Sequence, residues 1–166
     1  MIFSKERDLR LVTIRRGGTL TDRDHQLLAL WAAACPEHVL HFFEEVRPED
    51  GRPRHAVELA RGWVRGEVRM MRARDAAFAA NAAAREVSGE AREAAHAAGQ
   101  AGAVPHVAAH DLGAAAYAIR AARAAGGDEA ARRERDWQRT QLPDEIRELV
   151  LDDQRLRNEL CWSVFE

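Results

Sequence analysis

The stretch VPHVAAHDLGAAAYAIRAARAA, residues 104–125, decides the fold class. Apolar or small side chains recur along it at helical spacing, at Ala108, Leu112, Ala115, Ile119 and Ala122. A second stripe lies on roughly the opposite side, at His106, His110, Gly113 and Tyr117. A helix that is apolar or small on most of its circumference is usually packed on several sides. We therefore expect a central helix here, ended by the glycines at 126–127.

Stripes of the same period predict further helices on both sides of this one. Pro, Gly and capping residues place them over residues 21–36, 36–46, 53–66, 66–87, 88–98 and 128–139, and from 143 onward. Thr21 and Ser88 are the expected N-caps. No heptad run and no repeat is visible. The sequence therefore predicts an all-α orthogonal bundle of about seven or eight helices, not a coiled coil or a solenoid.

The first twenty residues differ from the rest. LRLVTI, residues 9–14, is β-branched and alternates imperfectly, and two glycines end it at 17–18. We expect residues 1–20 to form an extended, strand-like N-terminal arm and residues 21–166 to form a single helical domain. A chain of 166 residues fits one domain.

Charge and composition exclude several classes. Lys and Arg number 25 against 27 Asp and Glu, so the chain has no basic surplus of the kind that nucleic-acid binding requires. No stretch approaches the roughly 20 apolar residues of a membrane span, and MIFSKERDLR lacks the apolar core of a signal peptide. Cys35 and Cys161 are expected to be free and buried. These features predict a cytoplasmic protein that binds neither nucleic acid nor membrane.

Most catalytic signatures are absent from the sequence. There is no Gly-rich phosphate loop, no Gly-x-Ser-x-Gly elbow, no Cys-x-x-Cys pair and no His-Glu-x-x-His motif. We therefore predict that the protein is not an enzyme, and we expect no catalytic residue and no cofactor.

The histidines of the central segment are the one constellation that could carry chemistry. His106 and His110 are spaced as metal ligands on one helical face would be, but no third ligand stands at a diagnostic spacing. The favoured interpretation is that they are core histidines, with Asn81 as a hydrogen-bonding partner. A ligand or partner pocket formed by His106, His110, Tyr117 and Asn81 is the alternative, and we predict no metal.

Two features are candidates for a protein interface. Trp137 is the one large apolar residue of an otherwise charged helix, whereas Trp31, Trp63 and Trp162 lie on apolar stripes and are expected in the core. The acidic residues Glu44, Glu45, Glu49 and Asp50 most simply form a solvated face. Alternatively they form an anionic patch that steers a basic partner.

Three stretches resemble a known family. They are LVTIRRGGTLTD (11–22), which runs on into HQLLALWAAAC (25–35), then AFAANAAAR (77–85) and VPHVAAHDLGAAAYA (104–118). Together they resemble actinobacterial immunity proteins that carry an Imm-5-like helical domain, from about Leu11 onward. The position of Asn81 is more often His in that family, and this departure weighs against a metal site.

The resemblance implies a protein that protects a bacterium from a polymorphic toxin by binding and blocking it, with no catalytic residue. A small-molecule- or metal-binding helical protein or enzyme that uses His106 and His110 is the alternative, and a structural or regulatory homodimer is a third. The immunity hypothesis predicts an acidic or aromatic surface patch without an enclosed polar pocket. The second hypothesis predicts a cavity that reaches both histidines.

Overall fold

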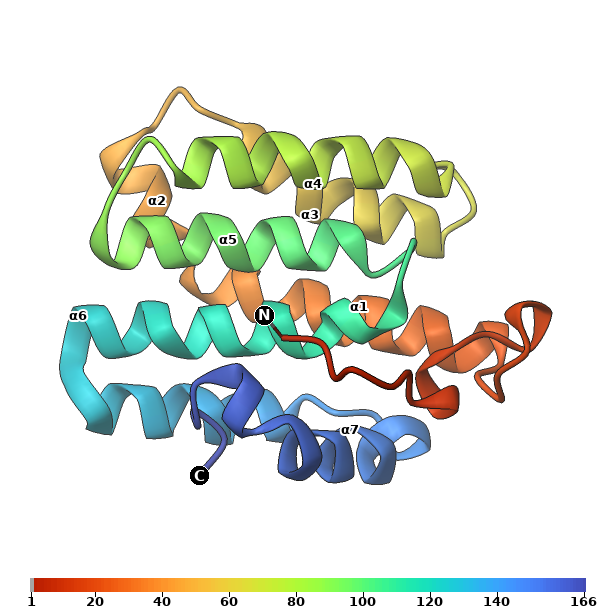
Figure 1. The fold of residues 1–166 in the computed structure, drawn as a ribbon. Coiled ribbons are helices and arrows are strands. Elements are labelled where there is room, and N and C mark those ends of the chain that lie inside the picture. Colours follow the sequence, from red (N-terminus) through yellow and green to blue (C-terminus); the bar gives the residue numbers. More distant parts are fainter. Residues whose placement is uncertain (1) are drawn as a thin grey trace.

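A computed structural model describes residues 2–166, in which the regular elements are helices and no β-strand occurs (Figure 1). The α-helices are α1 (Asp22–Val39), α2 (His41–Val46), α3 (Arg52–Val64), α4 (Met70–Ala84), α5 (Gly89–Ala103), α6 (Asp111–Thr140) and α7 (Asp144–Arg157). Short 3₁₀ turns are η1 (Leu9–Leu11), η2 (Ile14–Arg16), η3 (Ala108–His110) and η4 (Glu159–Cys161). The prediction of an all-α fold is confirmed.

The helices are stacked, with α5 near the middle. It packs on α4 and α3 on one side and on the first half of α6 on the other, and α1 contacts both α5 and α6 (Figure 1). Helices α3 to α6 run along a common direction in this view, while α7 is seen close to end-on. An orthogonal crossing of α3 to α6 is therefore not confirmed.

Small residues allow this close stacking. A Cβ atom at Gly102 of α5 would lie 3.1 Å from Cβ of Ala77 and 3.3 Å from Cβ of Ala56, so α3, α4 and α5 nearly touch at one point. In α6, Ala115 and Ala116 are fully buried. The prediction that this helix is central and packed on several sides is confirmed for its first half.

Several predicted helix boundaries are confirmed. The Thr21 side chain accepts a hydrogen bond from the backbone N–H of Asp24 at 3.1 Å, so it caps α1. Gly66, with φ of 75°, follows the end of α3. Gly127, with φ of 76° and ψ of −169°, interrupts α6, which folds back on itself at that point (Figure 1). Only glycine adopts such backbone angles without strain.

We expected Pro36 to end the first helix. Instead, α1 continues through Pro36 to Val39. Proline in a helix interior lacks the N–H that would bond to the carbonyl four residues earlier. Pro36 and Val39 are both buried, and the packing of this turn against the core offsets the lost hydrogen bond.

The predicted helix over residues 104–125 begins late, at Asp111. Pro105 has no N–H to donate, and the N–H groups of His106 and Val107 both bond to the carbonyl of Ala103, at 3.1 and 3.0 Å. The chain therefore turns before η3. The prediction that His106 and His110 share the face of one α-helix is wrong.

The expected N-terminal strand is replaced by η1 and η2, with a single parallel bridge between Thr13 and Leu20. The loop closes tightly, because a Cβ atom at Gly18 would lie 2.0 Å from the carbonyl oxygen of Val12. Its N–H and C=O groups are satisfied locally, for example by the bond from Leu20 N–H to the Val12 carbonyl. No sheet partner is needed.

Helix α7 ends at Arg157, and Trp162 beyond it is 40% exposed, although we expected it in the core. Leu156 and Leu160 are also exposed, at 54% and 37%. Trp162 has φ of 56°, so the chain leaves the helical path there. The expectation of free, buried cysteines is confirmed for Cys35 and Cys161.

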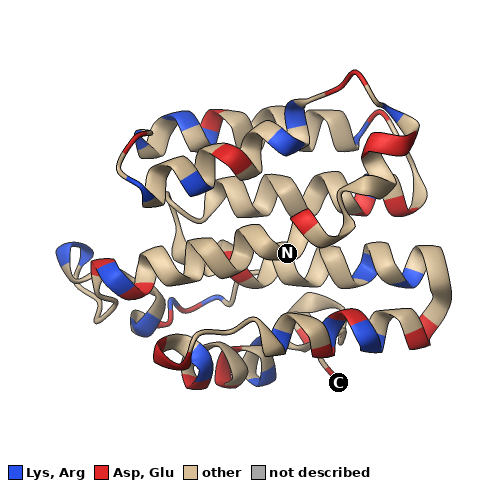
Figure 2. Cartoon of the chain, turned by 180° about the vertical axis from the view of Figure 1, so that it is seen from behind, with Lys and Arg blue, Asp and Glu red and all other residues tan. Residues whose placement is uncertain are grey.

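Charged residues of both signs are interspersed over the outer helices (Figure 2). The buried residues of α5 are all alanine or glycine. Among residues 2–166 no helix has the length and apolar character needed to cross a membrane.

Candidate functional site

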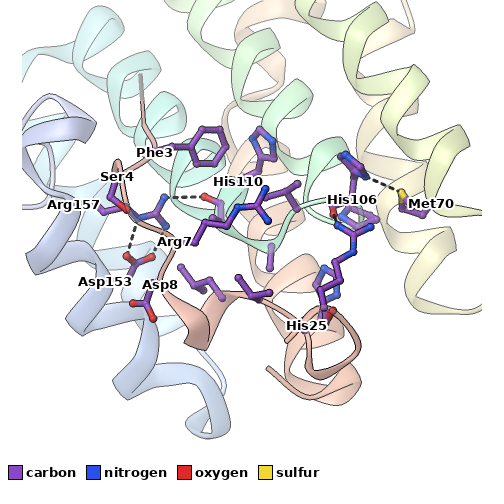
Figure 3. A pocket seen from close by; sticks show the side chains of 18 of the residues that line it. Phe3, Ser4, Arg7, Asp8, His25, Met70, His106, His110, Asp153 and Arg157 are labelled. Atoms are coloured by element: carbon purple, nitrogen blue, oxygen red, sulfur yellow. Dashed lines mark hydrogen bonds and ion pairs between the residues drawn. The ribbon is translucent and has the colours of Figure 1, made fainter. Parts of the chain in front are cut away.

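A groove of about 1120 Å³ lies where the N-terminal segment 3–16 passes over the turn at 105–110 (Figure 3). Helix α4 contributes side chains on one side and α7 contributes Asp153, Leu156 and Arg157 on the other. We name it the histidine groove, because His106 and His110 both line it. With His25 of α1 and Trp63 of α3, six segments that are distant in sequence line this groove.

His110 is held in place from two sides. Its Nδ1 lies 2.8 Å from Oε1 of Gln100, and the ring of Phe3 meets it edge-on at 4.8 Å. Burial lowers the pKa of His110 to about 4, and the positive charges of His106 and Arg157 act in the same direction. The ring is therefore neutral at pH 7.

His106 lies at the opposite end of the 105–110 turn. Its Nδ1 donates to Sδ of Met70 at 3.2 Å, and Arg16 donates to its backbone carbonyl at 3.3 Å. Partial burial lowers the pKa of His106, with further lowering by Arg74 and Arg16. Among residues 2–166 no three His, Cys, Asp or Glu side chains converge as metal ligands would.

His25 is a third histidine of the groove and was not predicted as a site residue. Its Nε2 donates to the carbonyl of Val104 at 2.8 Å and its ring packs on Trp63. His25 thus connects α1 to the start of the 105–110 turn. Burial lowers its pKa. The available signal was a polar residue on the apolar stripe of α1, one turn before Leu28.

A buried ion cluster closes the end of the groove beside α7. Arg157 donates from Nε to Oδ1 of Asp153 at 2.7 Å and from Nη2 to Oδ1 of Asp111 at 3.3 Å. Its Nη1 also donates to the carbonyls of Ile2 and Ala109, at 3.1 and 2.9 Å. One guanidinium therefore fastens the N-terminal segment to α7, η3 and α6.

Asp111 is the most perturbed member of this cluster. It is fully buried, and within residues 2–166 its Oδ2 has no hydrogen-bond partner. Burial raises the pKa of Asp111 to about 7, while the charge of Arg157 opposes the rise. The i, i+4 spacing of Asp153 and Arg157 was the only trace of the cluster in the sequence.

Basic side chains outnumber acidic ones around the groove. The basic residues are Lys5, Arg7, Arg15, Arg16, Arg74 and Arg157, and the acidic ones are Glu6, Asp8 and Asp153. Asp8 and Asp153 are already paired with arginines. Within residues 2–166 no hydrogen bond or ion pair engages the side chains of Lys5, Arg7 or Arg74. The groove is thus locally cationic in a chain whose net charge is −2.

Apolar side chains form part of the rim. Phe78 of α4 and Leu156 of α7 line the groove and are 58% and 54% exposed. The guanidinium of Arg74 lies 5.0 Å from the centre of the Phe78 ring. The rim therefore offers both cationic and apolar contact surface to a ligand.

The structure divides the predicted pocket residues into two places. His106 and His110 line the groove, whereas Asn81 Oδ1 lies 2.9 Å from Nδ1 of His96. Tyr117 packs near His96, with ring centres 5.1 Å apart. The predicted partnership of Asn81 with His106 and His110 is therefore wrong, since their partners are Met70 and Gln100.

The acidic residues that we considered as a patch are partly neutralised within the chain. Glu44 and Asp50 form ion pairs with arginines of α3. Glu45 and Glu49 are exposed. The arrangement provides less unpaired negative charge than the sequence suggested.

Trp137 is half-buried and stacks on His38, with ring centres 3.7 Å apart and planes 16° apart. Nδ1 of His38 lies 2.6 Å from the buried carboxylate of Glu134. Much of the indole surface is therefore covered by α1.

The fold and the groove together define a helical protein with an open groove between its N-terminal segment and its central turn. Residues 18–145 match the family described as Imm-5 like putative immunity protein, and the chain belongs to this family. No curated protein and no solved structure matches it. The matched range supplies His25, Trp63, α4 and the 105–110 turn, while the segments 3–16 and 153–157 of the groove lie outside it.

Proposed function

We propose that this protein neutralises a bacterial protein toxin in the cytoplasm by binding it and covering the surface through which the toxin acts. Membership of the immunity-protein family over residues 18–145 is the observation that carries the proposal. Binding, not chemical conversion, is the proposed mode of action.

The surface of the protein supports a role in protein binding. Interfaces are enriched in aromatic residues and arginine, and Phe78 with Arg74 beside it meets this description at the groove rim. The groove is open and not enclosed, because Arg7, Arg16 and Phe78 on its rim are exposed. This is compatible with the immunity hypothesis, which disfavoured an enclosed polar pocket.

A small-molecule-binding protein is the second candidate. The observation that favours it is the cavity itself, which reaches both His106 and His110. A homodimer remains the third candidate, and the mass of the purified protein in solution tests it directly.

The test requires a candidate toxin, and the first to examine is any secreted protein encoded beside this gene. Co-expression should restore growth of a host that the toxin alone arrests, and the two purified proteins should co-elute as one complex. Occlusion requires one molecule per toxin, so protection should end sharply below equimolar amounts. Protection at substoichiometric amounts, or a changed toxin mass after incubation, would show that the protein acts as an enzyme.

A further inference from the structure

We propose that the histidine groove receives an acidic segment of the partner protein, with carboxylates beside Arg7 and Arg74 and an apolar side chain against Phe78. This inference rests on the proposed function and adds the place and the chemistry of the contact.

The charges of the groove favour an anionic occupant. Arg7 comes from the N-terminal segment and Arg74 from α4, and both line the groove without an ion pair within residues 2–166. Lys5 adds a third unpaired cation. Arginine binds carboxylates through two parallel hydrogen bonds, so both guanidinium groups can still form this contact.

The same nearby positive charges lower the pKa values of His106 and His110. Arg74 and Arg16 face His106, while Arg157 faces His110 with its charge shared between Asp153 and Asp111. Burial and these cations lower the pKa values of both rings. A carboxylate in the groove would favour protonation of His106, the less buried of the two, so binding should be accompanied by proton uptake.

The size and the rim of the groove favour a protein segment over a small acid. A volume of about 1120 Å³ exceeds the roughly 300–1,000 Å³ of usual small-molecule sites. A free carboxylic acid would leave Phe78 and Leu156 exposed to water. A segment that alternates acidic and apolar side chains would pair the cations and cover both apolar residues.

The groove is also organised in advance. Arg157 donates a hydrogen bond to the carbonyl of Ile2. Phe3 packs on His110 (Figure 3), so the segment that carries Arg7 is fixed across the site. A fixed segment loses little conformational entropy when it binds.

The first experiment measures peptide binding to the full chain by fluorescence anisotropy. The probe is a labelled peptide of about ten residues that alternates Glu with Leu and Phe, and the control peptide carries Gln in place of Glu. The acidic peptide should bind about tenfold more tightly or better, and its affinity should fall as salt rises from about 50 to about 200 mM. Equal affinity for both peptides would overturn the inference.

The matched variants locate the site. The double variant Arg7→Glu/Arg74→Glu should lose about tenfold or more in affinity for the acidic peptide. Arg132→Glu should not, since Arg132 is exposed on α6, lies outside the groove and has no ion pair within residues 2–166. Equal loss in both variants would show unspecific charge attraction and overturn the inference. Circular dichroism and urea midpoints verify folding, and Arg7→Gln/Arg74→Gln replaces the double variant if charge reversal unfolds it.

Two further measurements separate the alternatives. The pKa of His106, followed by NMR, should rise when the acidic peptide saturates the groove, and an unchanged value would place the peptide elsewhere. If glutarate alone binds as tightly as the peptide and is lost in the same double variant, the occupant is a small acid and the inference is wrong.

Failure of this inference is distinguishable from failure of the proposed function. If the double variant still protects against the toxin as wild type does, the groove is not the docking site, while the neutralising function stands. If wild type gives no protection yet binds the acidic peptide in the groove, the proposed function fails and the carboxylate site remains.

Discussion

His110 lies half-buried between Gln100 and Phe3. The contact with Gln100 determines which ring nitrogen carries the proton. The carboxamide oxygen of Gln100 can only accept a hydrogen bond, so Nδ1 carries the proton and Nε2 is left as an acceptor. Burial and nearby positive charge keep this neutral form at pH 7. His110 is thus a structural residue that also borders the site.

We predict that His110→Ala lowers the free energy of unfolding by about 1–3 kcal/mol, because Gln100 loses its partner in a half-buried position. Urea denaturation at about pH 7.5 measures the change. His55→Ala is the control, since His55 is exposed on α3 and forms no side-chain hydrogen bond within residues 2–166. A midpoint and slope equal to those of wild type would show that the ring is dispensable for folding.

The pH dependence of stability provides a second prediction at this residue. The pKa of His110 is about 4 in the fold against about 6.5 in the unfolded chain. Between these values the unfolded state binds more protons, so this residue makes stability fall as pH falls. His110→Gln removes the effect, and its stability deficit at about pH 7.5 should shrink at about pH 4.5. A deficit that grows toward acid would contradict the assigned pKa.

The residues of the site were only partly predictable from sequence. Spacing singled out His106 and His110, and the structure does bring both to one groove. The predicted reason was one shared α-helical face, whereas in the structure a turn and η3 connect the two histidines. Their partners Gln100 and Met70 come from α5 and α4, and which side chain faces which histidine depends on how those helices pack. No local pattern encodes this.

The first half of α6 is the element whose packing tolerates least change. Ala115 and Ala116 have no exposed surface, and neighbouring helices contact α6 on several sides. We predict that Ala115→Leu lowers the free energy of unfolding by about 1–3 kcal/mol through overpacking. Urea denaturation measures the loss. Ala125→Leu, at an exposed position of the same helix, should change stability little.

Helix boundaries were predictable where a single residue imposes the backbone angles. Gly66 and Gly127 both have positive φ in the structure, and both were predicted as breaks. Pro36 was misjudged, because burial of its turn outweighs one lost hydrogen bond. The error at the 105–110 turn was the reverse, because a helix was predicted where none forms. The apolar periodicity continues through this segment, but Pro105 keeps it out of the helix.

The two ends of the chain complete one core that the family-matched range alone does not contain. Leu11 near the N-terminus and Ile146, Val150 and Phe165 near the C-terminus belong to the same buried cluster as α1 and α6. Composition and length predicted a single domain. They could not predict the groove, which exists only because the segments 3–16, 105–110 and 153–157 meet in space.

We predict that a fragment limited to residues 18–145 does not fold stably. On its C-terminal side it lacks four large apolar side chains of the core, namely Ile146, Val150, Val164 and Phe165, and on its N-terminal side it lacks Ile2 and Leu11. At about 1.5–3 kcal/mol each, burial of the four C-terminal side chains contributes about 6–12 kcal/mol before the cost of ordering this segment, which is comparable to the whole net stability of a typical domain, about 5–15 kcal/mol. The fragment also loses Arg157 and leaves Asp111 buried without its counter-charge.

Circular dichroism, urea denaturation and NMR dispersion of the fragment test this prediction against the full chain. The fragment should show reduced helicity and no cooperative transition. A second fragment, residues 9–166, keeps α7 and Leu11 and loses only Ile2 and Phe3 from the packed segment, so it should unfold cooperatively at a moderately lower midpoint. A cooperative transition of the 18–145 fragment near the wild-type midpoint would show that the matched range folds by itself and that the terminal segments serve the groove alone.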